Sequence, residues 1–273
     1  MSVRIRPVLL GAALALGLAF PAVAESAFEL RLRQAAREFG DLGREAREAA
    51  EIVFGTALHA LLHELGHALA GEFGLALPGR REEAIDSFAA LALLSLQDVP
   101  DGVFESAAAV WLPGRDDDHE SAFRRIHRFD GRRAAHLLCV LAGSDMRALR
   151  LPEEALAILR RRDCAAEHGR AKALWDGLLH GRLRDPGDPA PRIDLIYGRA
   201  RPEHRPYGDA LRVLRLLETV AGVAERYALP RRMTFETMSC GAANALRDAQ
   251  HRRITLCYEL VAEDIESLRR EAR

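Results

Sequence analysis

The chain has 273 residues, of which 49% are hydrophobic and 29% charged, a composition that excludes disordered and collagen-like proteins. Its 39 basic and 40 acidic residues leave a formal net charge of -1, so nucleic acid is not an expected partner. Only 6% of the residues are aromatic, and a core built mainly from Leu, Ala, Val and Ile is usually helical.

Residues 1–24 have the features of an export signal. Arg4 and Arg6 precede an apolar run over residues 8–20, and Ala22-Val23-Ala24 is the small-x-small pattern of a signal peptidase site. The run of about 13 residues is short of the roughly 20 needed to span a bilayer. We expect cleavage to leave a periplasmic or secreted protein without stable membrane insertion; a retained N-terminal anchor is the alternative.

Helical segments are expected between residues 27 and 179. Residues 27–73 are rich in alanine, contain no proline and have apolar residues three and four positions apart. Gly40, Gly43 and Gly55 are expected to break this stretch into two or three helices. Further helices are predicted over residues 81–96, 103–112, 132–141 and 153–179. The acidic run at residues 113–118 lacks the spacing of a calcium loop, so a solvated surface loop is favoured.

A proline-rich linker at residues 185–191 separates a helical part, residues 25–184, from a second segment, residues 192–273. In the second segment the pattern predicts an extended stretch over 192–197, a helix over 207–228, strands over 233–239 and 252–257 joined by an irregular connection, and a charged closing helix. The predicted fold class is therefore α+β and predominantly helical, with a small sheet from the C-terminal segment. Both segments are expected to belong to one domain.

Four cysteines lie in the part that would be exported, and an even number there favours disulfides over a metal cluster. Three connectivities are possible. We favour Cys139 with Cys164 and Cys240 with Cys257, because each pair closes a short local loop. The alternative is that one or more of them are buried thiols.

The sequence His63-Glu64-Leu65-Gly66-His67 is an HExxH zinc motif. The four-residue spacing places both imidazoles on one helix face, where they can bind one metal ion, with Glu64 beside the metal-bound water. In this interpretation zinc lowers the pKa of the water, and Glu64 takes its proton and passes it to the leaving amine.

A catalytic zinc ion needs a third protein ligand. Glu82 lies near the start of the next predicted helix, with Asp86 one turn further on the same face. This is the arrangement of gluzincin peptidases, where the aspartate holds the imidazole of a zinc-binding histidine. Glu83 is the rival ligand, but it is three residues from Asp86 and the four-residue relation is lost. His59 is one turn before His63. Residues four positions apart are rotated slightly about the helix axis, so three histidines in such a row cannot all approach one metal ion well. We therefore expect His59 to be a packing residue.

A further donor must stabilise the oxyanion of the tetrahedral intermediate. The candidates are His127, His136, Tyr207 and Tyr258. On spacing alone each is better explained as a structural residue, because buried His and Tyr side chains usually form hydrogen bonds with neighbouring polar groups.

Beyond single residues, the segments HELGHAL, GRREEAIDSFA, HRFDGRRAAHLLCVLAGSD, LPEE, RDC, WDGLL and CGAANALRDAQHRRITLCYEL together resemble the DUF4344 metallopeptidase family, over nearly the whole mature chain. The resemblance implies a zincin-like core and a gluzincin-type zinc peptidase. Its ligands would be His63, His67 and Glu82, its base Glu64, and its supporting aspartate Asp86.

The same resemblance makes His127 the leading oxyanion candidate. His127-x-x-Asp130-x-x-Arg133 matches an HSxDxxR stretch of the family. A histidine held by Asp130 is suited to donate a hydrogen bond to the oxyanion.

The order of the segments differs from the family's pattern, in which an Asn-Ala strand and a CYEL block precede HExxH. Here Asn244-Ala245-Leu246 and Cys257-Tyr258-Glu259-Leu260 stand near the C-terminus, which indicates a circular permutation. The closing helix is then expected to end beside the opening helix. The displaced strands can still form a sheet above the zinc helix, whose edge could bind an extended peptide. Leu246 replaces an aromatic residue of the family.

We therefore expect an exported metallopeptidase that holds one Zn²⁺ per chain and hydrolyses a peptide or protein substrate. One alternative is a catalytically degenerate relative that only binds peptides, against which the intact Glu64 argues, because this residue has no structural duty. Another is a zinc amidase that acts on cell-wall peptides.

Overall fold

The computed structural model describes residues 26–97, 99–100, 102–104, 131–143 and 153–271. The predicted export signal, the acidic loop, His127 and Asp130 lie outside these residues, as does most of the helix expected over 103–112. Within the described part of the chain, no helix combines the length and the apolar character that crossing a membrane would require.

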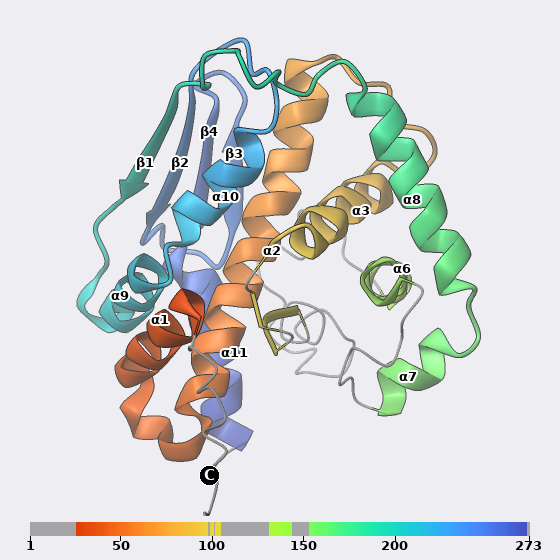
Figure 1. The fold of residues 1–273 in the computed structure, drawn as a ribbon. Coiled ribbons are helices and arrows are strands. Elements are labelled where there is room, and N and C mark those ends of the chain that lie inside the picture. The colour runs from red at the N-terminus through yellow and green to blue at the C-terminus, as the bar shows by residue number, and fades with distance from the viewer. Residues whose placement is uncertain (1–25, 98, 101, 105–130, 144–152, 272–273) are drawn as a thin grey trace, which may run out of the picture.

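The long helix α2, Ala46–Glu72, lies at the centre of the molecule (Figure 1). Nearly every residue from Ala49 to Ala70 is buried, as expected for a helix that is apolar all round. It follows α1, Ala27–Ala35, and a 3-10 segment, Ala36–Glu45. The break predicted at Gly43 is confirmed, because the 3-10 segment is kinked there, with φ +57°; the second non-helical residue of the segment is Phe39, next to Gly40.

The break expected at Gly55 is wrong, because this residue is buried inside α2. A glycine inside a helix costs only about 1 kcal/mol relative to alanine. The packing of a fully buried helix easily offsets that amount.

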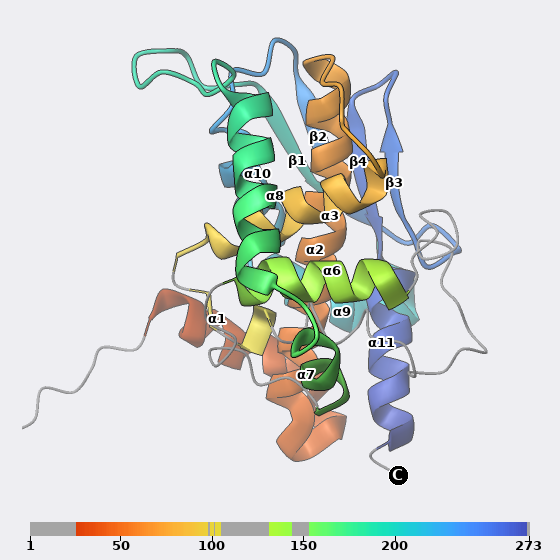
Figure 2. The same ribbon diagram turned by 90° about the vertical axis from the view of Figure 1, so that its right-hand side faces the viewer.

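In the described part of the chain, the helices α3, α6, α7 and α8 lie on one side of α2 (Figures 1 and 2). Their bounds are Arg81–Leu94 for α3, Gly131–Ala142 for α6, Glu153–Leu159 for α7 and Cys164–Leu179 for α8. Helix α3 packs directly on α2, and both α6 and α8 pack on α3. The single helix expected over 153–179 is thus two helices, because the Asp163 side chain accepts a hydrogen bond from the Ala166 N–H and caps a new one.

A four-stranded sheet lies on the other side of α2 (Figure 1). Its strands are β1, Ile193–Tyr197; β2, Met233–Met238; β3, Ala245–Asp248; and β4, Arg253–Cys257. The order is β1-β2-β4-β3, with β1, β2 and β4 parallel and β3 antiparallel to β4. Both β3 and β4 contact α2. The fold is therefore α+β and predominantly helical, with its small sheet supplied by the C-terminal segment, as the sequence predicts.

The pattern of alternating residues missed β3, which falls in the connection predicted to be irregular; only the family resemblance placed a strand there. The helix expected over 207–228 is also divided, into α9, Arg205–Val213, and α10, Leu216–Ala224. The break falls at Arg215, which has φ +58°. Residues 185–191 contain neither helix nor strand.

The last helix, α11, Tyr258–Glu271, packs on α2 and reaches back to the beginning of the chain. Its Arg269 donates from Nε to Asp41 Oδ2 at 2.9 Å, which ties α11 to the 3-10 segment that precedes α2. Segments from both ends of the sequence are therefore neighbours.

The four cysteines form two disulfides, and both pairs are those that the sequence analysis favours. Cys139–Cys164 joins α6 to the first residue of α8. Cys240–Cys257 joins the turn before β3 to the last residue of β4.

Candidate metal centre

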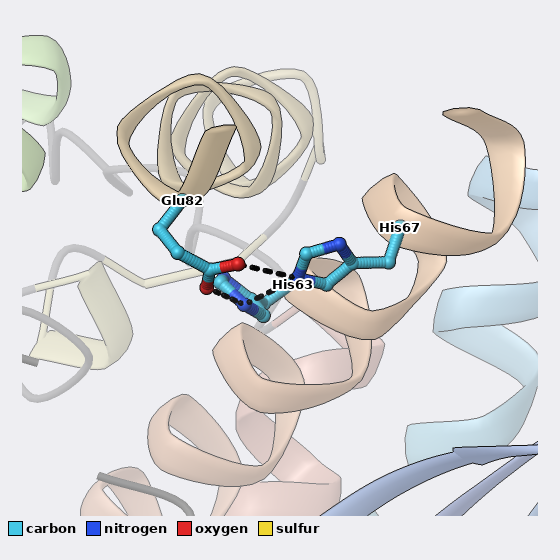
Figure 3. A group of neighbouring side chains, drawn as sticks. All are labelled: His63, His67 and Glu82. Atoms are coloured by element: carbon cyan, nitrogen blue, oxygen red, sulfur yellow. Dashed lines mark hydrogen bonds and ion pairs between the residues drawn. The ribbon is translucent and has the colours of Figure 1, made fainter. Parts of the chain in front are cut away.

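Helix α2 and helix α3 bring together three side chains that could hold a metal ion (Figure 3). His63 and His67 project from successive turns of α2, and their Nε2 atoms are 3.2 Å apart. Glu82, in the first turn of α3, places Oε2 3.4 Å from His63 Nε2 and Oε1 3.4 Å from His67 Nε2. Both histidines are buried, whereas Glu82 is partly exposed.

The distances between these three donors fit a zinc ion. Ligand atoms about 2.1 Å from a tetrahedral ion lie about 3.4 Å from one another. The measured separations of 3.2 Å and 3.4 Å are close to that value. Two imidazole nitrogens and one carboxylate are also a donor set typical of catalytic zinc.

Asp86 holds His63 from behind. Its carboxylate has no exposed surface, and Oδ1 accepts a hydrogen bond from His63 Nδ1 at 3.0 Å. A hydrogen on Nδ1 leaves the lone pair on Nε2, the atom that faces His67 and Glu82. Burial opposes the charge on Asp86, but hydrogen bonds from His63 and Arg133 outweigh this effect and lower its pKa to about 2.

The two candidate ligands of α2 differ in their affinity for protons. Burial opposes a charge on His63, but hydrogen bonds with Asp86 and Glu82 outweigh it and raise the pKa of His63. Burial lowers the pKa of His67. Since a metal binds only the deprotonated nitrogen, a metal ion competes with protons mainly at His63.

Arg133 is the residue of this site to which the sequence analysis gave no role. From α6, its Nε donates to Asp86 Oδ2 at 2.7 Å and its Nη2 to Asp86 Oδ1 at 2.8 Å. The same Nη2 lies 3.5 Å from Glu82 Oε2, and the side chain is only 5% exposed. The one sequence signal was its place at the end of the family's HSxDxxR stretch, because a partner 47 positions away in the chain leaves no local pattern.

The rival ligand Glu83 and the additional histidine His59 do not belong to the group of three donors. Glu83 points away from the histidines and forms ion pairs with Arg80 at 3.5 Å and Arg132 at 3.1 Å. His59 is buried, and its ring centroid is 6.3 Å from that of His63. Burial lowers the pKa of His59 to about 3, so it is a neutral packing residue at pH 7.

A cleft of about 390 Å³ opens beside the three donors. It is lined by Glu64, His67, Arg81, Glu82, Ala245, Leu246 and Arg247. One wall therefore comes from α2 and α3, and the other from β3 of the C-terminal segment. The carboxylate of Glu64 is almost buried, with 2% of the residue exposed, yet it faces this cleft.

Three of the oxyanion candidates do not line the cleft. His136 contacts Ser87 Oγ at 2.8 Å and Glu167 Oε2 at 3.1 Å. The Tyr207 hydroxyl accepts a hydrogen bond from Arg269 at 3.1 Å. The Tyr258 hydroxyl lies 2.9 Å from Thr237 Oγ1 and donates to the Gly198 carbonyl at 3.3 Å. The fourth candidate, His127, is outside the described residues.

Gly66, inside the HExxH motif, lets α3 approach α2 closely. A β-carbon at this position would lie 3.0 Å from Phe88 Cδ1 and 3.2 Å from Ile85 Cγ2. We expect Gly66→Ala to lose about 1–3 kcal/mol of unfolding free energy through overpacking, more than the ~1 kcal/mol gained in helix propensity. It should also weaken zinc binding, because α3 carries Glu82. Denaturant unfolding and zinc titration measure the two effects.

Gly71→Ala is the matched control for that variant. Gly71 is in the same helix, but nothing lies within 4 Å of the added β-carbon. This variant is expected to be as stable as the parent or more stable, with unchanged zinc affinity. Equal behaviour of the two alanine variants would show that Gly66 is not required for the approach of α3.

The chain matches the model of a known protein family. A family model named DUF4344 and described as "Putative metallopeptidase" matches residues 28–179. No curated protein and no solved structure matches the chain. The matched range contains α2, α3 and α6, which carry all the side chains of the candidate site: His63, His67, Glu82, Asp86 and Arg133. The four strands of the sheet lie after the matched range.

Proposed function

This chain belongs to the DUF4344 metallopeptidase family, and from that premise we propose that it is an exported zinc-dependent peptidase of gluzincin type. The convergence of His63, His67 and Glu82, with Asp86 behind His63, is the observation that carries the proposal. The family membership supports a metallopeptidase. The donor geometry supports zinc as its metal.

In this proposal His63, His67 and Glu82 hold the metal. A zinc ion bound there supplies a Lewis acid that polarises the scissile carbonyl and lowers the pKa of a water molecule. Glu64 faces the cleft next to His67, where its carboxylate can take the proton of the attacking water and return it to the leaving amine. Asp86 and Arg133 keep His63 oriented.

The substrate is an extended peptide segment in the proposed mechanism. Among the described strands only β4 pairs with β3, so no described strand occupies the outer edge of β3. Leu246 of this strand is 44% exposed and lines the cleft. Main-chain groups of a peptide can add to such an edge as a further strand, which would hold the scissile bond across from Glu64.

The proposal also covers the organisation of the chain. Residues 1–24 act as an export signal, and the two disulfides are compatible with an oxidising compartment. Residues 25–184 and 192–273, joined by the linker 185–191, form one circularly permuted catalytic domain. The contacts of β3, β4 and α11 with α2, and the Arg269–Asp41 ion pair near both ends of the chain, support this organisation.

Metal removal tests the proposed activity. We expect the purified protein to contain one zinc ion per chain and to hydrolyse an unfolded protein such as reduced casein. A chelator that strips the zinc should abolish hydrolysis, and one equivalent of Zn²⁺ should restore it. Protein without stoichiometric zinc, or hydrolysis that survives complete removal of the metal, contradicts the proposal.

Adjacent glutamates provide a matched pair of variants for the metal site. Glu82→Gln is expected to lose zinc, because it removes a charged ligand. Glu83→Gln removes the same charge one residue away, from a side chain paired with Arg80 and Arg132, and should retain zinc and activity. Zinc content of both variants after dialysis distinguishes the two glutamates directly.

A further inference from the structure

Two arginines line the candidate catalytic cleft from opposite walls. Arg81 is the first residue of α3, next to Glu82, and Arg247 is in the middle of β3. Both side chains are exposed. Neither guanidinium group forms a hydrogen bond or an ion pair with any residue in the described part of the chain.

The strand geometry explains why Arg247 faces the cleft. Side chains two positions apart in a strand share one face of the sheet. Ala245, two positions before Arg247, is buried where β3 contacts α2. Arg247 therefore projects to the same side as Ala245, toward the metal-binding helix.

The other charged groups of the cleft are already engaged. Glu82 interacts with both histidines and with Arg133, and Glu64 is the proposed base. A metal ion would add further positive charge beside them. Among the described residues that line the cleft, the free charges that an incoming substrate meets are therefore two guanidinium groups, one on each wall.

We propose that Arg81 and Arg247 form a carboxylate-binding subsite, and that the enzyme prefers peptides with a carboxylate close to the scissile bond. This inference rests on the proposed peptidase function and adds the class of substrate. A guanidinium group presents paired N–H donors that match the two oxygens of a carboxylate. The carboxylate can belong to an Asp or Glu side chain or to the C-terminus of a short peptide, since the chemistry is the same.

The test uses the zinc-loaded full chain and peptides of one length and one scissile bond. One pair carries Glu or Gln beside that bond, and a second pair has a free or an amidated C-terminus. We expect kcat/KM to be about tenfold or more higher for the carboxylate member of at least one pair, the scale of a charge-assisted hydrogen bond. The pair that responds identifies the source of the carboxylate. Added salt should reduce the preference.

Variants assign the preference to the two arginines. In Arg81→Gln and Arg247→Gln the ratio of kcat/KM between the carboxylate and amide peptides should fall toward one. Arg232→Gln is the control, because Arg232 is also exposed but pairs with Asp194 outside the cleft, and its ratio should stay at the parent value. Zinc content confirms that each variant is folded at its metal site.

Two outcomes would overturn the inference in different ways. Equal kcat/KM for the carboxylate and amide members of both pairs, in an enzyme that cleaves them, removes the subsite and leaves the peptidase intact. No cleavage of any peptide or protein by zinc-loaded enzyme removes the proposed function as well. Binding of the same peptides to the Glu64→Gln variant provides a second readout that needs no turnover.

Discussion

Glu64→Gln is expected to lower kcat by about 10²–10⁴-fold while one zinc ion per chain is retained, since that is the usual contribution of a general acid and base. Glutamine has nearly the same size as glutamate but cannot accept the proton of a water molecule. Glu64 is not among the three side chains whose donor atoms converge on one point. Steady-state kinetics on a peptide substrate, with zinc content of the same sample, measures both quantities.

Two results would contradict this role of Glu64. An unchanged kcat would show that proton transfer does not depend on this carboxylate. Loss of zinc from the variant would show instead that Glu64 is needed to build the metal site. The Glu83→Gln variant serves here as well, because it controls for the loss of one negative charge near the start of α3.

Arg133→Met is expected to cost about 3–5 kcal/mol of unfolding free energy in the metal-free protein. It leaves the carboxylate of Asp86 charged in a position with no exposed surface, and breaking one side of a buried ion pair usually costs this amount. Zinc affinity should also fall by about 10–100-fold, since Asp86 would no longer fix His63. Denaturant unfolding and competition with a zinc-binding dye measure the two effects separately.

Companion variants separate this role from a general loss of packing. Arg132→Met, on the same helix, breaks an ion pair with Glu83 in which the arginine is 58% exposed, and should cost less than about 1 kcal/mol. Arg133→Lys should have a higher zinc affinity than Arg133→Met, because it keeps the positive charge although it cannot form the bidentate hydrogen bonds with Asp86. Adding Asp86→Asn to Arg133→Met should regain stability by removing the buried charge. Equal losses in the Arg132 and Arg133 methionine variants would argue against a special role for Arg133.

The sequence could predict the parts of the site that depend on local periodicity. His63 and His67 share a helix face because they are four residues apart, and Glu82 and Asp86 share one for the same reason. Choosing Glu82 over Glu83 needed only this register, and in the structure Glu82 is the one that lies beside the histidines. The helical character of residues 46–72 and the strands β2 and β4 likewise follow from patterns within one segment.

The rest of the site depends on contacts between distant segments. Arg133 meets Asp86 only because α6 packs on α3, and Arg247 faces the cleft only because β3 docks on α2. The two wrong helix predictions, the break at Gly55 and the single helix over 207–228, also depend on structure that a local pattern does not show. Gly55 stays helical because its surroundings are fully packed, whereas the chain turns at Arg215 through a positive φ that few arginines adopt.

The two disulfides cross-link each wall of the cleft within itself. Cys139–Cys164 joins α6 to α8 behind the wall that carries Glu82, and Cys240–Cys257 holds both ends of the turn and strand that form the opposite wall. All four cysteines are used in these bonds, so no disulfide joins one wall to the other across the cleft. Each disulfide therefore ties neighbouring elements within one wall, while the placement of one wall relative to the other depends on the noncovalent packing of α3, β3 and β4 on α2.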